Sequence, residues 1–389
     1  MRILVLGAGR MGLGAAFDLA HNSEGVERVT IADFDEGRAR AVAETVGGAE
    51  RVRAARVDVA DSAGVVALMR GHEAVISCVP YVHNLSLARA AIEARANFCD
   101  LGGNNTVVDA ELALDSEARA AGIRIIPDCG LAPGMVSVLV AHGAARFERL
   151  DEVHIRVGGL PQQPKPPLDY QIVFSVEGLI NEYVERARVI RDGHLIEVES
   201  MTEIESLEFP APYGRMEAFQ TSGGTSTLPE TFAGRVRELD YKTIRYPGHC
   251  ERFKLLIALG LADGVEVELD GARVSPRRLL GELLTRRLPA DEPDLVFVRV
   301  EFRGQMGGKE ASQSLRYDII DRHDERTGLS AMMRTTAFPA SIIAQMMARR
   351  GDIRETGAIP QERCVPPERF VAELTRRNIT IKESLESGV

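Results

Sequence analysis

The chain has 389 residues, of which 27% are charged and 45% hydrophobic, so it is long enough for two globular domains. Its 47 basic and 57 acidic residues give a formal charge of −10, and no basic cluster offers a surface for nucleic-acid phosphates. No apolar run approaches the roughly 20 residues that span a membrane, and the N-terminus lacks a signal-peptide layout. We therefore expect a cytoplasmic protein with neither a nucleic-acid nor a membrane partner.

The first 33 residues have the pattern of a dinucleotide site. Residues 2–6 are typical of a buried strand, and the motif GxGxxG follows at once before an apolar helix. In such a turn the first glycine permits the bend, the second lets the backbone approach the pyrophosphate, and the third lets helix and strand pack closely. The helix N-terminus then favours the phosphates. The cofactor-binding residues predicted from this turn are Gly7, Gly9, Arg10, Met11 and Gly12.

Two acidic residues bear on the identity of the cofactor. Asp33 ends the second strand about twenty positions after Gly12, where a carboxylate binds the ribose hydroxyls and repels a 2′-phosphate. This predicts NAD rather than NADP, although Arg38 and Arg40 lie close downstream and keep NADP open. Asp58 ends the next strand and is predicted to meet the adenine side; an acid exposed at the sheet edge is the alternative.

Strands and helices alternate up to about residue 130. Helices are expected over 36–46, 62–69, 85–94 and 109–121, with strands ending near 59, 79, 100 and 126. This alternation predicts an α/β fold, a Rossmann doubly wound parallel sheet covered on both faces. Ligands collect beyond the carboxyl ends of such strands, so the stretches 79–83, 100–105 and 128–134 should line one crevice facing the nicotinamide. Val79 and Pro80 join the predicted cofactor site for this reason.

Beyond about residue 150 the pattern becomes that of half-exposed antiparallel strands, which predicts a second, α+β domain. The Gly- and Pro-rich stretch 158–167 is expected to form a long loop, and Ser275-Pro276 to begin a helix. An apolar helix over 342–348 is expected to return to the first domain. The predicted domains are 1–130 for the dinucleotide, 131–335 for substrate and dimerisation, and 336–389 as the returning segment.

Three segments carry candidate chemistry. In the turn 128–134, Asp128 ends a strand and Pro133 suits a first helical turn; a plain strand-to-helix turn is the alternative. The stretch 241–249 combines cation, phenol and imidazole, as an amino-acid site requires, although a surface strand has similar composition. The hydroxyl-rich loop 222–231 either offers donors to a carboxylate or is a hairpin tip. The candidate side chains in the last two segments are Lys242, Arg245, Tyr246, His249, Thr225 and Ser226.

The five cysteines give no sign of a metal centre or a disulfide framework, because their number is odd and no CxxC spacing occurs. We expect reduced thiols and no bound metal.

Together these pieces resemble the saccharopine dehydrogenase-like family, and within it most closely the NAD-dependent L-lysine 6-dehydrogenases. The residues that carry the resemblance are the glycine turn 7–12, the turn 128–134, the loop 222–231, the run 245–249 and the helix after Phe338-Pro339. The resemblance implies a homodimer of two-domain subunits with an amino-acid substrate held between the domains. NAD would oxidise the ε-amine of lysine to a 6-semialdehyde, which cyclises, with release of ammonia.

In this hypothesis Arg245 pairs with the substrate carboxylate, with Tyr246, Thr225 and Ser226 as further binding residues. His249 is the first candidate base and Asp128 the second, because the ε-amine must be neutral before hydride leaves; Lys242 is a further catalytic candidate. An NADP-dependent, glutamate-forming saccharopine reductase is the alternative among enzymes. A regulatory protein that binds NAD without turnover is the alternative of another class.

Overall fold

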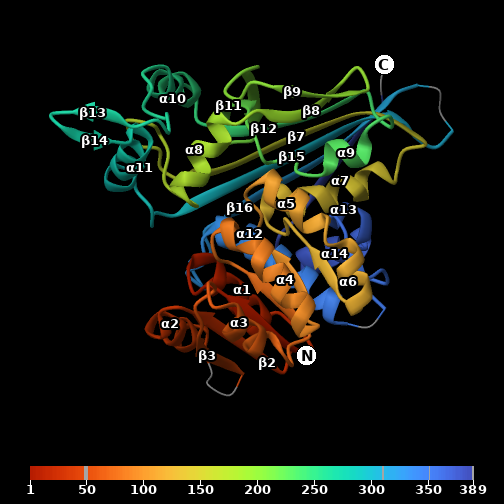
Figure 1. The fold of residues 1–389 in the computed structure, drawn as a ribbon. Helices are drawn as coiled ribbons and strands as arrows, with labels where there is room; N and C mark the ends of the chain where they lie inside the picture. The colour runs from red at the N-terminus through yellow and green to blue at the C-terminus, as the bar shows by residue number, and fades with distance from the viewer. Residues whose placement is uncertain (48–50, 309–310, 350, 388–389) are drawn as a thin grey trace. The chain divides into compact units, whose positions relative to one another are not determined.

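The structure is a computed structural model that describes residues 1–47, 51–308, 311–349 and 351–387 (Figure 1). The chain divides into two compact units. The first holds residues 1–146, 226–228 and 333–380, and the second holds 147–225, 229–332 and the residues from 381 onward. Within the described ranges, no helix is both long and apolar enough to cross a membrane.

The first unit is built on a sheet of seven parallel strands in the order β17-β6-β5-β4-β1-β2-β3. Its central strands are apolar and buried, apart from the exposed Arg2 that begins β1, because helices cover both faces, as in a Rossmann-type fold. The strands are β1 (Arg2–Leu6), β2 (Arg28–Asp33), β3 (Val52–Arg56), β4 (Ala74–Ser77), β5 (Asn97–Asp100), β6 (Arg124–Ile126) and β17 (Gly357–Ala358).

The helices of this unit follow the strands closely along the chain. The predicted helices over 36–46 and 62–69 are confirmed, whereas the single helix expected over 109–121 is two helices with a break before Asp115. The helices are α1 (Arg10–His21), α2 (Glu36–Val46), α3 (Ser62–Met69), η1 (Tyr81–His83), α4 (Asn84–Ala94), α5 (Asn105–Leu112), α6 (Asp115–Ala121), η2 (Leu131–Met135), α7 (Val136–Ala144), α12 (Ala331–Ala348), α13 (Gln361–Cys364) and α14 (Pro367–Arg376).

The second unit has a mixed sheet in the order β10-β11-β12-β7-β15-β16-β18, with β8 pairing β12 and β9. All of its neighbouring strands run antiparallel except β12 and β7. The strands are β7 (Arg149–Pro161), β8 (Ala187–Arg191), β9 (His194–Val198), β10 (Glu205–Phe209), β11 (Gly214–Gln220), β12 (Glu238–Arg245), β15 (Asp294–Gln305), β16 (Gln313–Arg322) and β18 (Lys382–Ser387).

Figure 1 shows α10 and α11 grouped with a small hairpin at one end of this sheet. Ser275 caps α11 by accepting a hydrogen bond from the Arg278 amide, as the sequence predicts. The remaining elements of the unit are α8 (Val176–Val184), α9 (Leu228–Phe232), α10 (His249–Ala258), α11 (Pro276–Arg287), β13 (Val267–Leu269) and β14 (Ala272–Val274).

Two local expectations are wrong, and a third is confirmed only in part. The loop predicted over 158–167 begins only after Pro161, because β7 stays paired with β15 up to that residue; a side chain at Gly158 would lie 2.4 Å from the Ile244 carbonyl oxygen. Pro133 lies in the kink before α7 rather than in a first helical turn. The residues predicted as a helix over 342–348 are helical, but their helix, α12, begins much earlier, at Ala331, and continues through Pro339.

Residues 333–380 pack in the first unit around a buried ion pair. The Arg377 Nε donates to Asp18 Oδ1 on α1 at 2.7 Å, and both side chains are 0% exposed. The Ser341 hydroxyl on α12 donates to the other Asp18 oxygen at 2.6 Å. Asp18 therefore joins three segments that lie far apart in the sequence.

Removal of Arg377 should strongly destabilise the protein. Arg377→Ala leaves the Asp18 carboxylate buried without its cation, so we expect the free energy of unfolding to fall by about 3–5 kcal/mol. Arg376→Ala is the matched control, because Arg376 is half exposed and its ion pairs contribute less than about 1 kcal/mol. Urea unfolding followed by circular dichroism measures both. Similar losses of unfolding free energy in the two variants would show that the buried Asp18–Arg377 ion pair does not hold these segments together.

Candidate active site

The glycine-rich turn has both a packing requirement and an open face. Gly7 has φ of +97°, and a Cβ at this residue would lie 2.8 Å from the Cys78 carbonyl oxygen. A Cβ at Gly12 would lie 1.8 Å from the Gly7 carbonyl oxygen. A Cβ at Gly9 would have no heavy atom within 4 Å. Gly7 and Gly12 thus serve the fold, whereas Gly9 leaves room for a ligand to approach the backbone.

The start of α1 suits an anion. Gly9 is its N-cap and has no side chain with which to satisfy the first amides, and the first turn holds no acid. The Asp33 carboxylate lies beneath this turn: Oδ2 accepts from the Ala8 amide at 2.7 Å and Oδ1 from the Asp35 amide at 3.0 Å. These features fit a dinucleotide, with the pyrophosphate at Gly9 and a ribose at Asp33.

The other predicted cofactor residues lie around the same edge of the sheet. Val79 follows β4 and would lie 3.1 Å from a Cβ at Gly7, and Pro80 precedes η1. Arg10 and Met11 open α1. Asp58 follows β3 and accepts from the Ala60 amide at 2.9 Å, so it caps a turn.

Asp128 lies at the carboxyl end of β6 and is almost completely buried. Its Oδ2 accepts a hydrogen bond from the Ser226 hydroxyl, and its carbonyl oxygen accepts one from the Gln361 side-chain amide at 3.0 Å. Asp128 and Ser226 both have positive φ, +60° and +44°, a conformation in which non-glycine residues are strained. Such strain is found preferentially at functional sites.

Two further carboxyl groups lie beside Asp128. Asp100 ends β5 and Glu111 lies on α5, and both are fully buried. Burial raises the pKa of Asp100 to about 6, and burial together with the charge of Asp100 raises the pKa of Asp128 to about 8. Burial and the same negative neighbours raise the pKa of Glu111 to about 10.

In the second unit, Arg245 ends β12 in an aromatic enclosure. Its guanidinium carbon lies 4.8 Å from the Tyr170 ring centroid and 5.8 Å from that of Tyr183. Nε donates to the Tyr183 hydroxyl at 2.8 Å, and Nη1 donates to the Ile244 carbonyl at 2.9 Å. No carboxylate among the described residues lies within ion-pair distance of this buried cation. The arrangement suits a ligand carboxylate.

His249 occupies the same enclosure but has both ring nitrogens engaged. Nδ1 donates to the Leu168 carbonyl at 2.9 Å, so Nε2 accepts from the Tyr183 hydroxyl, 3.0 Å away. Burial and the positive charge of Arg245 lower its pKa to about 3. In this arrangement His249 is a poor acceptor for a substrate proton, and its contacts support the enclosure instead.

The remaining candidates lie apart from Arg245. Alternation along β12 points Lys242 to the opposite face, where Nζ lies 3.0 Å from Glu205 in an ion-pair network. The Tyr246 hydroxyl donates to the Pro161 carbonyl at 2.8 Å, and Thr225 donates to the Arg188 carbonyl at 3.1 Å. Of the loop 222–231, only residues 226–228 belong to the first unit, so Ser226 and Thr225 lie in different units.

The sequence patterns do not single out several residues of both clusters. Tyr170, Tyr183 and Glu182 surround Arg245, and burial raises the pKa of Glu182 to about 7 against the opposing charge of Arg245. No local signal marked them, since they precede Arg245 by more than sixty positions. Glu111 had a signal, because helical periodicity places it on the buried face with Val108.

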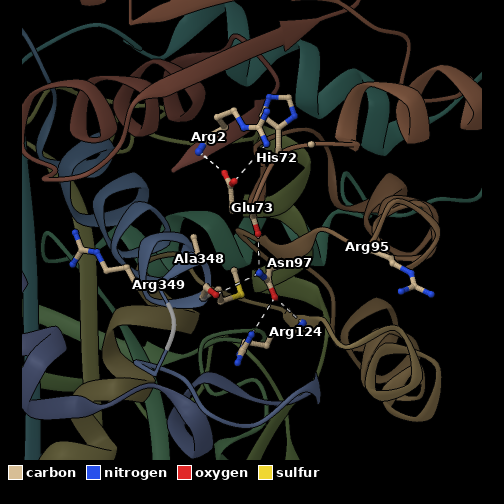
Figure 2. Close-up of a pocket in the computed structure, with 10 residues that line it drawn as sticks. Arg2, His72, Glu73, Arg95, Asn97, Arg124, Ala348 and Arg349 are labelled. Carbon is tan, nitrogen blue, oxygen red and sulfur yellow. Dashed lines mark hydrogen bonds and ion pairs between the residues drawn. The ribbon is translucent and has the colours of Figure 1, made fainter.

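A cavity of about 350 Å³ lies at the other edge of the first sheet, at the amino ends of β1, β4, β5 and β6. Figure 2 shows its polar residues, with Arg95 and Arg349 pointing away from one another. Arg2 pairs with Glu73, and Arg124 donates to Asn97. None of the predicted site residues lines this cavity, and ligands of such sheets bind at the carboxyl ends. We therefore place the candidate active site elsewhere.

No group of His, Cys, Asp and Glu side chains in the described part of the chain is arranged to hold a metal ion. The glycine turn, Asp33 and the parallel sheet define a nicotinamide dinucleotide-binding oxidoreductase with a second α+β unit. Two family models match: the saccharopine dehydrogenase NADP binding domain over residues 3–126 and the saccharopine dehydrogenase C-terminal domain over 130–379. The chain belongs to the saccharopine dehydrogenase family, whose members are oxidoreductases that act on amino acids.

Individual relatives are distant. Saccharopine dehydrogenase [NADP(+), L-glutamate-forming] of Saccharomyces cerevisiae is 24% identical over 67% of this chain, which spans only 58% of that enzyme. Carboxynorspermidine synthase of Vibrio cholerae is 25% identical, with 94% of this chain and 93% of that protein aligned.

Two solved structures share the fold. The apo yeast saccharopine dehydrogenase (L-Glu forming) has a TM-score of 0.80 at 18% identity, with 99% of each chain covered. The homospermidine synthase of Legionella pneumophila, solved with NAD, has a TM-score of 0.67 at 11% identity, covering 98% of this chain and 91% of that one.

Gly9 and Gly12 should respond differently to alanine. Gly9→Ala should keep the melting temperature of the free protein, since φ is −82° and no heavy atom lies near the new Cβ. It should weaken dinucleotide binding at least about tenfold, because the methyl group meets the pyrophosphate. Gly12→Ala should lower the melting temperature itself. Thermal unfolding and NADH fluorescence titration, free of tryptophan overlap because the chain has none, measure these effects. An unchanged affinity in Gly9→Ala would place the pyrophosphate elsewhere.

Proposed function

We propose that the protein oxidises the ε-amine of L-lysine with NAD to an iminium, which water then hydrolyses to ammonia and a 6-semialdehyde that cyclises. The observation that carries this proposal is the Asp33 carboxylate at the end of β2, held by the Ala8 and Asp35 amides. A carboxylate in this position repels a 2′-phosphate and therefore favours NAD. When bound, NAD supplies the acceptor for the hydride, and Gly9 and Asp33 would hold its pyrophosphate and ribose.

In the first unit, Asp128 is the proposed base. The lysine ε-amine has an ordinary pKa near ~10.4 and must lose a proton before its lone pair can stabilise positive charge on the neighbouring carbon. Asp128 has a pKa of about 8, so its carboxylate form predominates above that pH and accepts this proton. Ser226 donates to the carboxylate and orients it. We assign the base to Asp128 rather than His249 because both nitrogens of His249 are occupied.

In the second unit, Arg245 is the proposed partner of the substrate carboxylate. A guanidinium forms two parallel hydrogen bonds with a carboxylate, and the aromatic enclosure keeps water away from the pair. Lys242, Tyr246 and Thr225 are left out of the proposed chemistry, because their polar atoms already bind Glu205 and backbone carbonyls. The homodimer and the cytoplasmic location stay predictions.

An NADP-dependent saccharopine reductase is the second candidate. It is favoured by the NADP-linked names of the yeast relative and of the N-terminal family model. Arg56 also lies opposite Asp33 on β3 and donates to the Phe34 carbonyl at 3.3 Å, so a cation is present near the ribose edge.

A steady-state assay separates these functions. We expect NADH to form from NAD and lysine alone, with ammonia in equal amount, and a much lower rate with NADP. NADPH oxidation that requires both an aldehyde and glutamate would instead establish the reductase. Tight NAD binding without turnover of any amine donor would establish the regulatory alternative.

Loss of Arg245 should act on the substrate rather than on the cofactor. Arg245→Lys keeps the charge but loses the two-pronged geometry, and we expect KM for lysine to rise about 10- to 100-fold while KM for NAD changes little. Arg252→Ala, which removes a half-exposed cation paired with Asp169, is the control. Equal rises in both KM values for Arg245→Lys would remove Arg245 from the substrate site.

A further inference from the structure

Three carboxyl groups gather at the carboxyl edge of the first sheet without a counter-charge. Asp100, Glu111 and Asp128 are 0%, 0% and 1% exposed. Among the residues that the structure describes, no arginine, lysine or histidine forms an ion pair with any of them. Three buried negative charges in one place would cost far more free energy than the fold can supply, so protons must be bound there.

The hydrogen bonds show where a proton is missing. Asp100 Oδ1 accepts from the amides of Gly102 and Asp128, at 2.6 and 3.3 Å, and Asp128 Oδ2 accepts from Ser226. Asp100 Oδ2 and both oxygens of Glu111 have no donor. Asp100 and Glu111 lie within hydrogen-bonding range of each other, and two carboxylates can bond only through a proton. One proton on Glu111, donated to Asp100, accounts for Asp100 Oδ2 and for one of the two Glu111 oxygens.

Among the residues that the structure describes, the groups that act on Asp128 add no positive charge. They are Asp100 from β5, Glu111 from α5, Glu362 from α13 and the hydroxyl of Ser226. Glu362 accepts from the Thr227 hydroxyl at 2.9 Å. The Cys129 thiol beside Asp100 has its pKa raised well above the ordinary value by burial, so it stays neutral. The ionisation of Asp128 therefore depends on the charge of Asp100 and Glu111.

We propose that Glu111 is a positioning residue for the reaction: it keeps a proton that it shares with Asp100, and it thereby tunes Asp128 to accept the proton of the substrate amine. The inference rests on the proposed function. The substrate ammonium gives one proton to the Asp128 carboxylate, and Glu111 retains its own proton throughout. Without the Glu111 carboxyl as hydrogen-bond donor, Asp100 would take up a proton itself. The negative charge of the Asp100 carboxylate beside Asp128 would then be lost.

The test compares the pH dependence of kcat/KM for amine oxidation in Glu111→Gln and Glu111→Leu. Wild-type activity should rise with pH through about 8, because the Asp128 carboxylate is the working form. Glu111→Gln keeps a neutral hydrogen-bond donor to Asp100 and should leave the rising limb of the pH profile unchanged. Glu111→Leu removes the hydrogen-bond donor to Asp100. The rising limb of the pH profile should then move about one pH unit lower, because Asp100 becomes neutral and no longer raises the pKa of Asp128. Glu117→Gln, on the exposed side of α6, is the control.

Two results would overturn the inference. A downward shift in Glu111→Gln would show that Glu111 is ionised in the wild type, and an unchanged limb in Glu111→Leu would show that it does not act on Asp128. Infrared difference spectroscopy at pH 9 provides a readout without activity, since Glu111 should then be the protonated carboxyl of this cluster and its band should vanish in Glu111→Gln. If the wild type oxidises no amine, the proposed function fails, and the infrared band still decides whether Glu111 holds the proton.

Discussion

The constraint on which this structure depends is the burial of ionisable groups without a partner of opposite charge. In the first unit, Asp100, Glu111 and Asp128 lie out of water, and no cation in the described part of the chain forms an ion pair with them. In the second unit, Arg245 is enclosed by tyrosines with Glu182 nearby, and it forms no ion pair with a carboxylate among the described residues. Each arrangement is costly for a fold that serves stability alone, since buried charges are ordinarily paired. A ligand carboxylate would complement Arg245, and a substrate amine would complement the carboxyl group of Asp128; this is the basis of the proposed substrate.

The fold supplies these groups by different means in its two units. The parallel sheet brings the ends of β5 and β6 to one edge, and the short helix α13 adds Gln361 and Glu362 to it. Asp128 and Ser226 hold strained left-handed conformations there, and their mutual hydrogen bond helps to maintain both. In the second unit, the enclosure is formed by β12 with residues from α8, α10 and the stretch before α8, so rigid elements position the guanidinium.

Sequence patterns predicted the parallel sheet of the first unit and the glycine turn within it. The motif at 7–12 and the acid at 33 depend on local geometry, and the structure places an open helix N-terminus and a carboxylate together as that motif requires. The stretch 241–249 was harder to interpret, because composition does not say which face of a strand a side chain occupies. Alternation along β12 separates Lys242 from Arg245, and the cluster therefore divides between an ion-pair network and an aromatic enclosure.

By itself, the sequence determined the class of fold and the dinucleotide turn, because hydrophobic periodicity and glycine spacing act over a few residues. Only the tertiary structure decided which distant residues meet. Tyr183 contacts Arg245 across 62 positions, Ser226 contacts Asp128 across 98, and Arg377 contacts Asp18 across 359. Burial decided the rest: the pKa of a carboxyl or imidazole group depends on the water and charges around it, and these are set by the packing of the whole unit.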